Sequence, residues 1–198
     1  MFVIIFVLEI KWSIFCVTFQ ELGRFQILDS KKWVVVNRYN NEFLINRYNN
    51  DLLIHIRKFE TEGRKTYPTK KGVCFPPPIL ATLRMQMDDI LNALDGIMSG
   101  KVEEFKLHLG RGIFCSISKK FCHVDLRHFF ELDGKLTATT RGLSLKSEEW
   151  LELKRILREV FDLDMDIRRA MPCMFSGTHT LPGSCDICNP IVFSTNYL

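Results

Sequence analysis

Three patterns that mark common enzyme classes are missing from this sequence of 198 residues. It has no glycine-rich phosphate loop, no nucleophile elbow and no His-Glu-x-x-His metallohydrolase motif. Carboxylates crowd residues 147–166, where a solvated helix face explains them better than acid–base chemistry does. We therefore predict that the chain is not an enzyme and that it requires no cofactor.

A strong net charge and a long apolar run are also lacking. The net charge is +4, too small to indicate a nucleic-acid binder by itself, and 46% hydrophobic residues are typical of a globular protein. The apolar run over residues 1–8 is too short to span a membrane, and no basic residue precedes it. We expect no membrane contact, and leave residues 1–24 open as a signal, an anchor, an extra strand or a non-native start.

The seven cysteines form no regular disulfide framework, because their number is odd and their spacing irregular. A nuclear or cytosolic compartment, which keeps thiols reduced, is the simpler interpretation. In the tail, residues 167–198, a Cys-x-x-Cys pair and flanking turn residues are typical of a zinc knuckle. Its candidate ligands are Cys173, His179, Cys185 and Cys188. The alternative is a tail that packs lightly and binds no metal.

Charge is distributed unevenly along the chain. Residues 31–71 contain ten basic and four acidic side chains, whereas residues 147–166 contain seven acidic and three basic ones. The basic stretch creates a local positive field, which attracts an anionic polymer.

Two copies of one pattern follow each other, with a constant offset of 70 residues. The residues Ile54, Ile56, Arg57, Phe59 and Gly72 recur as Val124, Leu126, Arg127, Phe129 and Gly142. We place the first repeat at 25–98, a linker at 99–103 and the second repeat at 104–166. A shorter duplication at 37–45 and 46–54 either lengthens a hairpin or has no function.

Each repeat reads as strands followed by a helix. In residues 52–59, Leu52, Ile54 and Ile56 alternate with His55, Arg57 and Phe59, which predicts a strand with one apolar face and one basic, aromatic face. Residues 79–98 and 148–163 have helical apolar spacing instead. We predict an α+β fold of two tandem β-β-β-β-α units, in which a helix covers the apolar face of its own sheet.

A basic and aromatic face on an antiparallel sheet suits single-stranded nucleic acid, because cations neutralise phosphates and rings stack on unpaired bases. The candidate residues in the first repeat are Tyr39, Tyr48, Arg57, Phe59, Lys65, Lys70 and Lys71. In the second repeat they are Lys119, Lys120, Arg127, Phe129, Phe130 and Arg141.

The order FQI, VVVNRY, LLIHIRKF and KKGV before a helix resembles the positive cofactor four family, RNA polymerase II coactivators that bind single-stranded DNA. The run TRGLSLKSEEWLELKRI in the second copy is similar to that family's turn and helix start. The resemblance implies curved sheets, kinked helices that form the dimer contact, and strand channels for melted DNA. It aligns Arg57 and Arg127 with the strand arginine, and Lys71 and Arg141 with the basic residue before glycine.

The resemblance also implies roles for aromatic residues, and this chain departs from the family in places. Tyr48 aligns with the hairpin aromatic and Phe130 with the ridge aromatic, but the first repeat has Glu60 where Phe130 stands in the second. Asp125 beside Arg127 is expected to weaken the attraction for phosphate. The helix start has Leu80 in one copy and Trp150 in the other.

We therefore expect a nuclear transcription regulator that binds single-stranded or melted DNA, and that contacts activators and general transcription factors as the family does. Because the two copies are covalently linked, we expect an intramolecular pseudo-dimer, with a domain-swapped homodimer as the alternative. Two other functions stay open: a protein-interaction module whose DNA surface has decayed, and a single-stranded RNA or DNA binder in genome maintenance.

Overall fold

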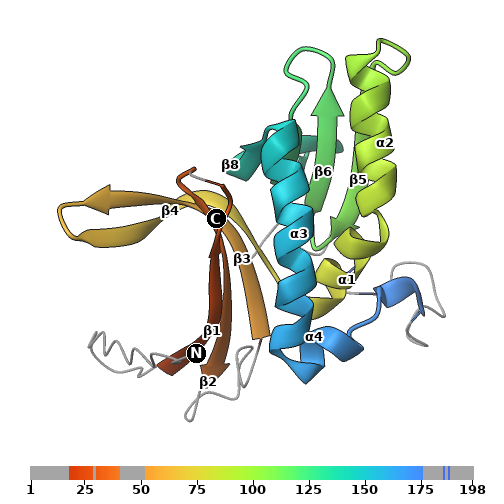
Figure 1. The fold of residues 1–198 in the computed structure, drawn as a ribbon. Helices are drawn as coiled ribbons and strands as arrows, with labels where there is room; N and C mark the ends of the chain where they lie inside the picture. The colour runs from red at the N-terminus through yellow and green to blue at the C-terminus, as the bar shows by residue number, and fades with distance from the viewer. Residues whose placement is uncertain (1–17, 29, 41–51, 176–184, 186, 188–198) are drawn as a thin grey trace.

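Two antiparallel sheets of four strands each make up the framework of the computed structural model, which describes residues 18–28, 30–40, 52–175, 185 and 187. The first half contains β1 (Thr18–Gln26), β2 (Lys32–Asn40), β3 (Leu52–Glu62), β4 (Lys65–Phe75), α1 (Pro77–Met85) and α2 (Met87–Met98). The second contains β5 (Glu104–Gly110), β6 (Ile113–Ser118), β7 (Val124–Leu132), β8 (Lys135–Leu145), α3 (Ser147–Leu163), α4 (Met165–Arg169) and a 3-10 turn (Cys173–Phe175). The predicted tandem α+β architecture is confirmed (Figure 1).

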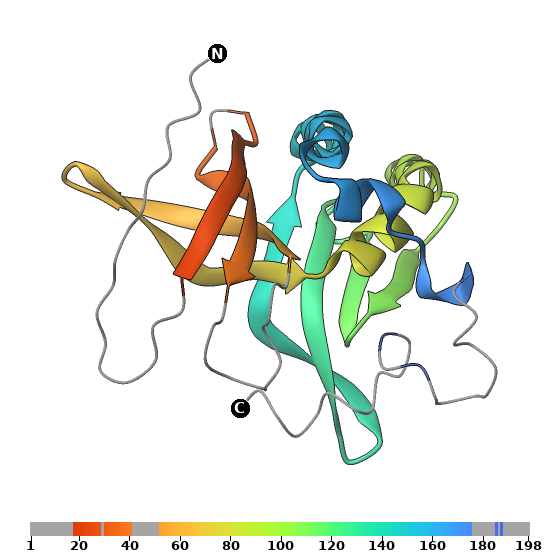
Figure 2. The same cartoon turned by 90° about the horizontal axis from the view of Figure 1, so that it is seen from below.

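Both sheets are simple meanders, with strand orders β1-β2-β3-β4 and β5-β6-β7-β8. The first sheet begins at Thr18, seven residues before the start that we assigned to the first repeat. The strands β3 with β4, and β7 with β8, continue past their sheets as two hairpin arms (Figures 1 and 2). Arg57/Phe59 and Arg127/Phe129 each enclose a β-bulge at the base of an arm, and a bulge bends its strand.

The strand alternation predicts the buried face correctly. Leu52, Ile54 and Ile56 of β3 are buried, and Val34 and Val36 of the neighbouring β2 join them in the core. We call this the inner face of the sheet and the opposite side the outer face. All helices lie together on the inner side of the two sheets (Figure 2).

The helices are exchanged between the two halves, which differs from our expectation that each covers its own sheet. Helix α2 of the first repeat packs on β5 and β6, whereas α3 of the second repeat packs on β1 and β2 and also contacts β8. A break at Gln86 separates α1 from α2, so the first repeat has the kinked helix that the resemblance implies. The two sheets meet where β4 lies beside β8.

Two ion pairs fix α3 to the first sheet. Lys32 Nζ lies 2.6 Å from Glu149 Oε2, and Arg38 Nη2 lies 2.7 Å from Asp164 Oδ2. Burial alone would raise the pKa of Glu149, but the hydrogen bond from Lys32 outweighs it and the pKa is lowered. Buried apolar residues of both repeats form one continuous cluster, so the repeats share a core. None of the helices in the described part of the chain has the length and apolar composition of a transmembrane span.

Candidate functional site

The strand arginines of the two repeats make the same contacts at the bases of the two arms. Arg57 Nη1 donates to the Thr69 carbonyl at 3.0 Å, and Arg127 Nη1 donates to the Thr139 carbonyl at 2.8 Å. Thr69 Oγ1 in turn donates to the Lys58 carbonyl at 2.8 Å. The 70-residue repeat therefore extends to hydrogen bonds, and each arginine secures the bulge from which its arm projects.

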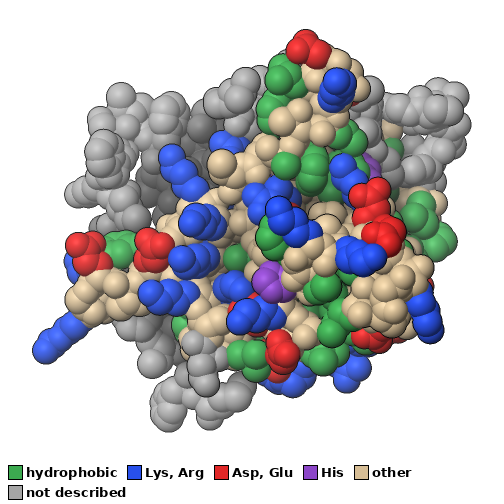
Figure 3. All heavy atoms as spheres, turned by 90° about the horizontal axis from the view of Figure 1, so that it is seen from above, with side chains coloured by type: hydrophobic (Ala, Val, Ile, Leu, Met, Phe, Trp, Pro, Cys, Tyr) green, Lys and Arg blue, Asp and Glu red, His purple; other side chains and the backbone are tan. Residues whose placement is uncertain are grey.

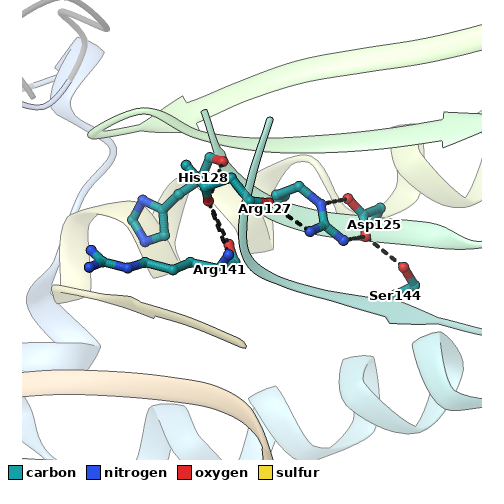
Figure 4. Close-up of polar contacts among 6 residues, drawn as sticks. Asp125, Arg127, His128, Arg141 and Ser144 are labelled. Atoms are coloured by element: carbon teal, nitrogen blue, oxygen red, sulfur yellow. Dashed lines mark hydrogen bonds and ion pairs between the residues drawn. The ribbon is translucent and has the colours of Figure 1, made fainter. Parts of the chain in front are cut away.

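The second repeat neutralises its arginine. Arg127 Nε and Nη2 donate to the two carboxylate oxygens of Asp125 at 2.8 and 2.9 Å, and Ser144 Oγ donates to Asp125 Oδ1 at 2.6 Å (Figure 4). The hydrogen bond from Asp125 raises the pKa of Arg127 further. This bidentate pair satisfies most of the guanidinium, as we expected from the position of Asp125 in the sequence.

The first repeat leaves its arginine without such a partner. His55 occupies the place of Asp125, because it pairs with Cys74 as Asp125 pairs with Ser144. Among the described residues Arg57 has no carboxylate partner, and its Nε is buried without a hydrogen bond. The two outer faces thus share a backbone plan but differ by one negative charge.

Each outer face also holds a cation between two aromatic rings, which our sequence reasoning missed. In the first sheet Arg24 Cζ lies 5.0 Å from the ring centroid of Phe59 and 6.0 Å from that of Trp33. In the second sheet Lys106 Nζ lies 4.2 Å from the ring centroid of Phe129 and 5.0 Å from that of Phe114. Such cation–π contacts are attractive at these distances.

The strand pairing shows that these two clusters are equivalent. Trp33 lies opposite Arg57 as Phe114 lies opposite Arg127, yet Trp33 and Phe114 are 81 residues apart. The offset of 70 therefore fails before residue 52, where the short duplication lengthens the first repeat. A search that allowed this insertion would have found Trp33 and Phe114, although not the lysine and arginine above them.

The aromatic candidates are less exposed than the alternation suggests. Phe59 is on the predicted outer face but only 5% exposed, because Trp33 packs against its edge and Arg24 covers it. Tyr39 is half-buried, and its hydroxyl lies 3.3 Å from His55 Nε2. Phe129 and Phe130 are half-buried. Tyr48 lies outside the described residues.

The basic candidates are mostly at the surface. Lys119 pairs with Glu103 at 2.7 Å, and Lys120 lies 5.2 Å from the ring centroid of Phe121. The exposed candidates that have no ion pair among the described residues are Lys65, Lys70, Lys71 and Arg141. The Arg141 guanidinium lies beside the His128 ring, on the opposite side from the Asp125–Arg127 pair (Figure 4). Three of these four bases are on the β3–β4 arm.

The two arms differ in charge. Residues 58–71 of the β3–β4 arm contain five basic and two acidic side chains, whereas residues 128–141 of the β7–β8 arm contain two of each. Lys and Arg side chains line the β3–β4 arm, which projects to the left in Figure 3. Tyr67 on this arm is 48% exposed. Leu132 and Leu136 make the tip of the other arm apolar.

A groove of about 470 Å³ runs over the outer face of the second sheet. Its floor includes Lys106, Ser116, Asp125 and Ser144, one from each of the four strands. Phe121 at its edge is 63% exposed. The volume lies within the range of small-ligand sites, and the lining combines rings with a few polar groups.

The tail docks onto the second repeat. The Arg111 amide donates to the Ile187 carbonyl at 2.7 Å, and Cys173 and Cys185 are both buried. The described residues contain no cluster of three or more metal-ligating side chains, but His179 and Cys188 lie outside them. The zinc site therefore stays a prediction.

Two buried histidines should make the fold sensitive to acid. Burial, and then Arg57, lower the pKa of His55 to about 4, and burial with Arg141 and Arg57 does the same for His128. Below about pH 6.5 the unfolded chain binds protons that the folded chain does not, so the free energy of unfolding falls as the pH drops towards 4. Urea unfolding midpoints between about pH 7 and pH 4.5 measure this loss. The variant His55→Asn/His128→Asn should flatten the dependence, and an unchanged slope would contradict the assignment.

The comparisons with known proteins add little to this geometry. No protein-family model matches the chain, so membership of the positive cofactor four family stays a prediction, and no curated protein matches it either. Among solved structures, crystal structures of MRP1/MRP2 from Trypanosoma brucei align with 75% of this chain and 85% of theirs. The identity is 12% and the TM-score is 0.28, so this distant match identifies neither the site nor the function.

Proposed function

We propose that this protein binds single-stranded nucleic acid along the β3–β4 arm and the outer faces of both sheets. The observation that carries the proposal is the charge of the arm. Arg64, Lys65, Lys70 and Lys71 are exposed, and none has an ion pair within the described residues. Solvated cations of this kind bind phosphates, because binding releases the counterions condensed on the strand.

Exposed rings favour a single strand over a duplex. Tyr67 stands among the bases of the arm, and Phe121 stands at the edge of the groove on the second sheet. Unpaired bases stack on such rings, whereas the bases of a duplex are already stacked on each other. The cation–aromatic clusters around Arg24 and Lys106 add positive charge beside both outer faces.

The resemblance to the positive cofactor four family supports a more specific role for this binding. We propose that the protein is a non-catalytic nuclear regulator of RNA polymerase II transcription, which binds melted DNA and contacts activators and general transcription factors. It acts as a monomeric pseudo-dimer, because α2 and α3 are exchanged between its own two repeats. Structural zinc in the tail is part of the same proposal.

The alternative of a docking module with an acidic helix has less support. Of the seven acidic side chains in residues 147–166, six form ion pairs within the chain, and Glu148 is the exception among printed contacts of the described residues. Those carboxylates stabilise the fold rather than offer a free negative surface.

Fluorescence anisotropy of the full chain with labelled oligonucleotides tests the proposal. We expect tighter binding of single-stranded DNA than of duplex, with an affinity that falls steeply as salt rises. A matched RNA oligomer separates a DNA role from an RNA role. Absence of binding at low salt, or a clear preference for duplex, would overturn the proposed function.

A further inference from the structure

A row of polar side chains crosses the floor of the groove on the second sheet. Lys106 lies opposite Ser116, Ser116 opposite Asp125, and Asp125 opposite Ser144. Side chains opposite each other in neighbouring strands have Cβ atoms about 5 Å apart. The first sheet has no such row, because Val35, His55 and Cys74 take the places of Ser116, Asp125 and Ser144.

The carboxylate of Asp125 is held in one orientation but is not saturated. Oδ1 accepts hydrogen bonds from Arg127 Nη2 and Ser144 Oγ, whereas Oδ2 accepts only from Arg127 Nε. A carboxylate has about four acceptor positions, and a serine hydroxyl rotates to suit its partners. If Ser144 turns away, one position becomes available on each oxygen and the hydroxyl becomes a donor beside them. Asp125 and Ser144 then present two acceptors and one donor.

This array is complementary to one nucleobase. The Watson–Crick edge of guanine carries two adjacent donors, the N1–H and the 2-amino group, followed by the O6 acceptor. Thymine and uracil turn carbonyl oxygens towards a carboxylate, and adenine offers a single amino donor beside an acceptor nitrogen. Guanine is therefore the base that matches Asp125 and Ser144 without an unpaired or repelled group.

The geometry points to a pocket for one unpaired guanine on the second sheet. Phe121, 63% exposed at the edge, supplies a face for stacking, and Phe129 lines the wall. Arg127 positions the carboxylate, so its pairing with Asp125 serves recognition rather than only cancelling charge. This inference rests on the proposed function, and it divides the labour: the first repeat binds phosphates and the second reads a base.

Thymine oligomers that carry one central substitution test the pocket. Anisotropy with the full chain should give about tenfold tighter binding for a central guanine than for the all-thymine strand, which is the usual value of a bidentate base contact. Hypoxanthine, which lacks the 2-amino group, should fall between them. Equal affinities for guanine and thymine would overturn the pocket and leave the proposed function standing.

Two variants and a control link the preference to the residues. Ser144→Ala should reduce the guanine-to-thymine ratio, whereas Cys74→Ala, at the equivalent position of the first sheet, should leave it unchanged. Asp125→Asn should bring the ratio close to one and tighten binding of the thymine strand, because Arg127 is released from its pair. A ratio that survives in both Ser144→Ala and Asp125→Asn would contradict the assignment.

A measurement without an oligomer separates the two proposals. Guanosine and uridine monophosphates are titrated into the full chain and followed by amide chemical shifts. Shifts at Asp125 and Ser144 with the guanosine compound alone support the pocket even if every oligomer fails to bind, in which case the proposed function is wrong. Identical shifts with both compounds, or none, overturn the pocket.

Discussion

Replacing Lys65, Lys70 and Lys71 with glutamate should reduce the affinity for single-stranded DNA by about a hundredfold or more at about 0.1 M salt. Each lysine that neutralises a phosphate contributes about 0.7 to the slope of log affinity against log salt on a single strand. Loss of three contacts therefore lowers the slope by about 2, and the new negative charges add repulsion. Anisotropy over a salt series measures both quantities.

A second triple variant controls for net charge. Lys101, Arg158 and Arg169 are exposed and lie in the α2–β5 turn, α3 and α4, away from the outer faces. Their replacement by glutamate changes the net charge by the same amount, but it should leave the slope nearly unaltered. An equal loss of affinity in both variants would show that the protein responds only to its overall charge, and the arm would lose its special role.

Local pattern predicts much of this fold. The repeat at an offset of 70 residues and the alternation around Ile54 and Ile56 indicate two strand-rich units with one buried face each, and the structure confirms both. Alternation assigns a side chain to a face but not its exposure. Phe59 therefore has the predicted orientation while Trp33 and Arg24 cover it.

Which sheet a helix covers is not encoded in its periodicity. The apolar stripe of α3 requires a greasy partner, and either sheet supplies one. The choice depends on contacts between distant residues, such as Lys32 with Glu149, which are 117 residues apart. The groove is similarly hidden in the sequence, because Lys106, Ser116, Asp125 and Ser144 become neighbours only through strand register.

The exchange of helices has a measurable consequence for stability. Trp150 at the start of α3 is fully buried, and it belongs to the apolar cluster that joins both repeats. Trp150→Ala should lower the free energy of unfolding by about 3–5 kcal/mol, the usual cost of deleting a large buried ring. Since the core is shared, the first repeat should unfold in the same transition although the substitution is in the second.

Two probes of urea unfolding test this cooperativity. In Trp150→Ala the remaining fluorescence comes from Trp12 and Trp33, both in the N-terminal half, whereas far-UV circular dichroism reports on the whole chain. The two midpoints should shift together, as they should in the matched variant Leu80→Ala at the equivalent buried position of α1. Midpoints that separate in Trp150→Ala would mean that the repeats unfold independently. The helices would then bind the sheets too weakly for one repeat to hold the other in place, and the two outer faces would not act as one surface.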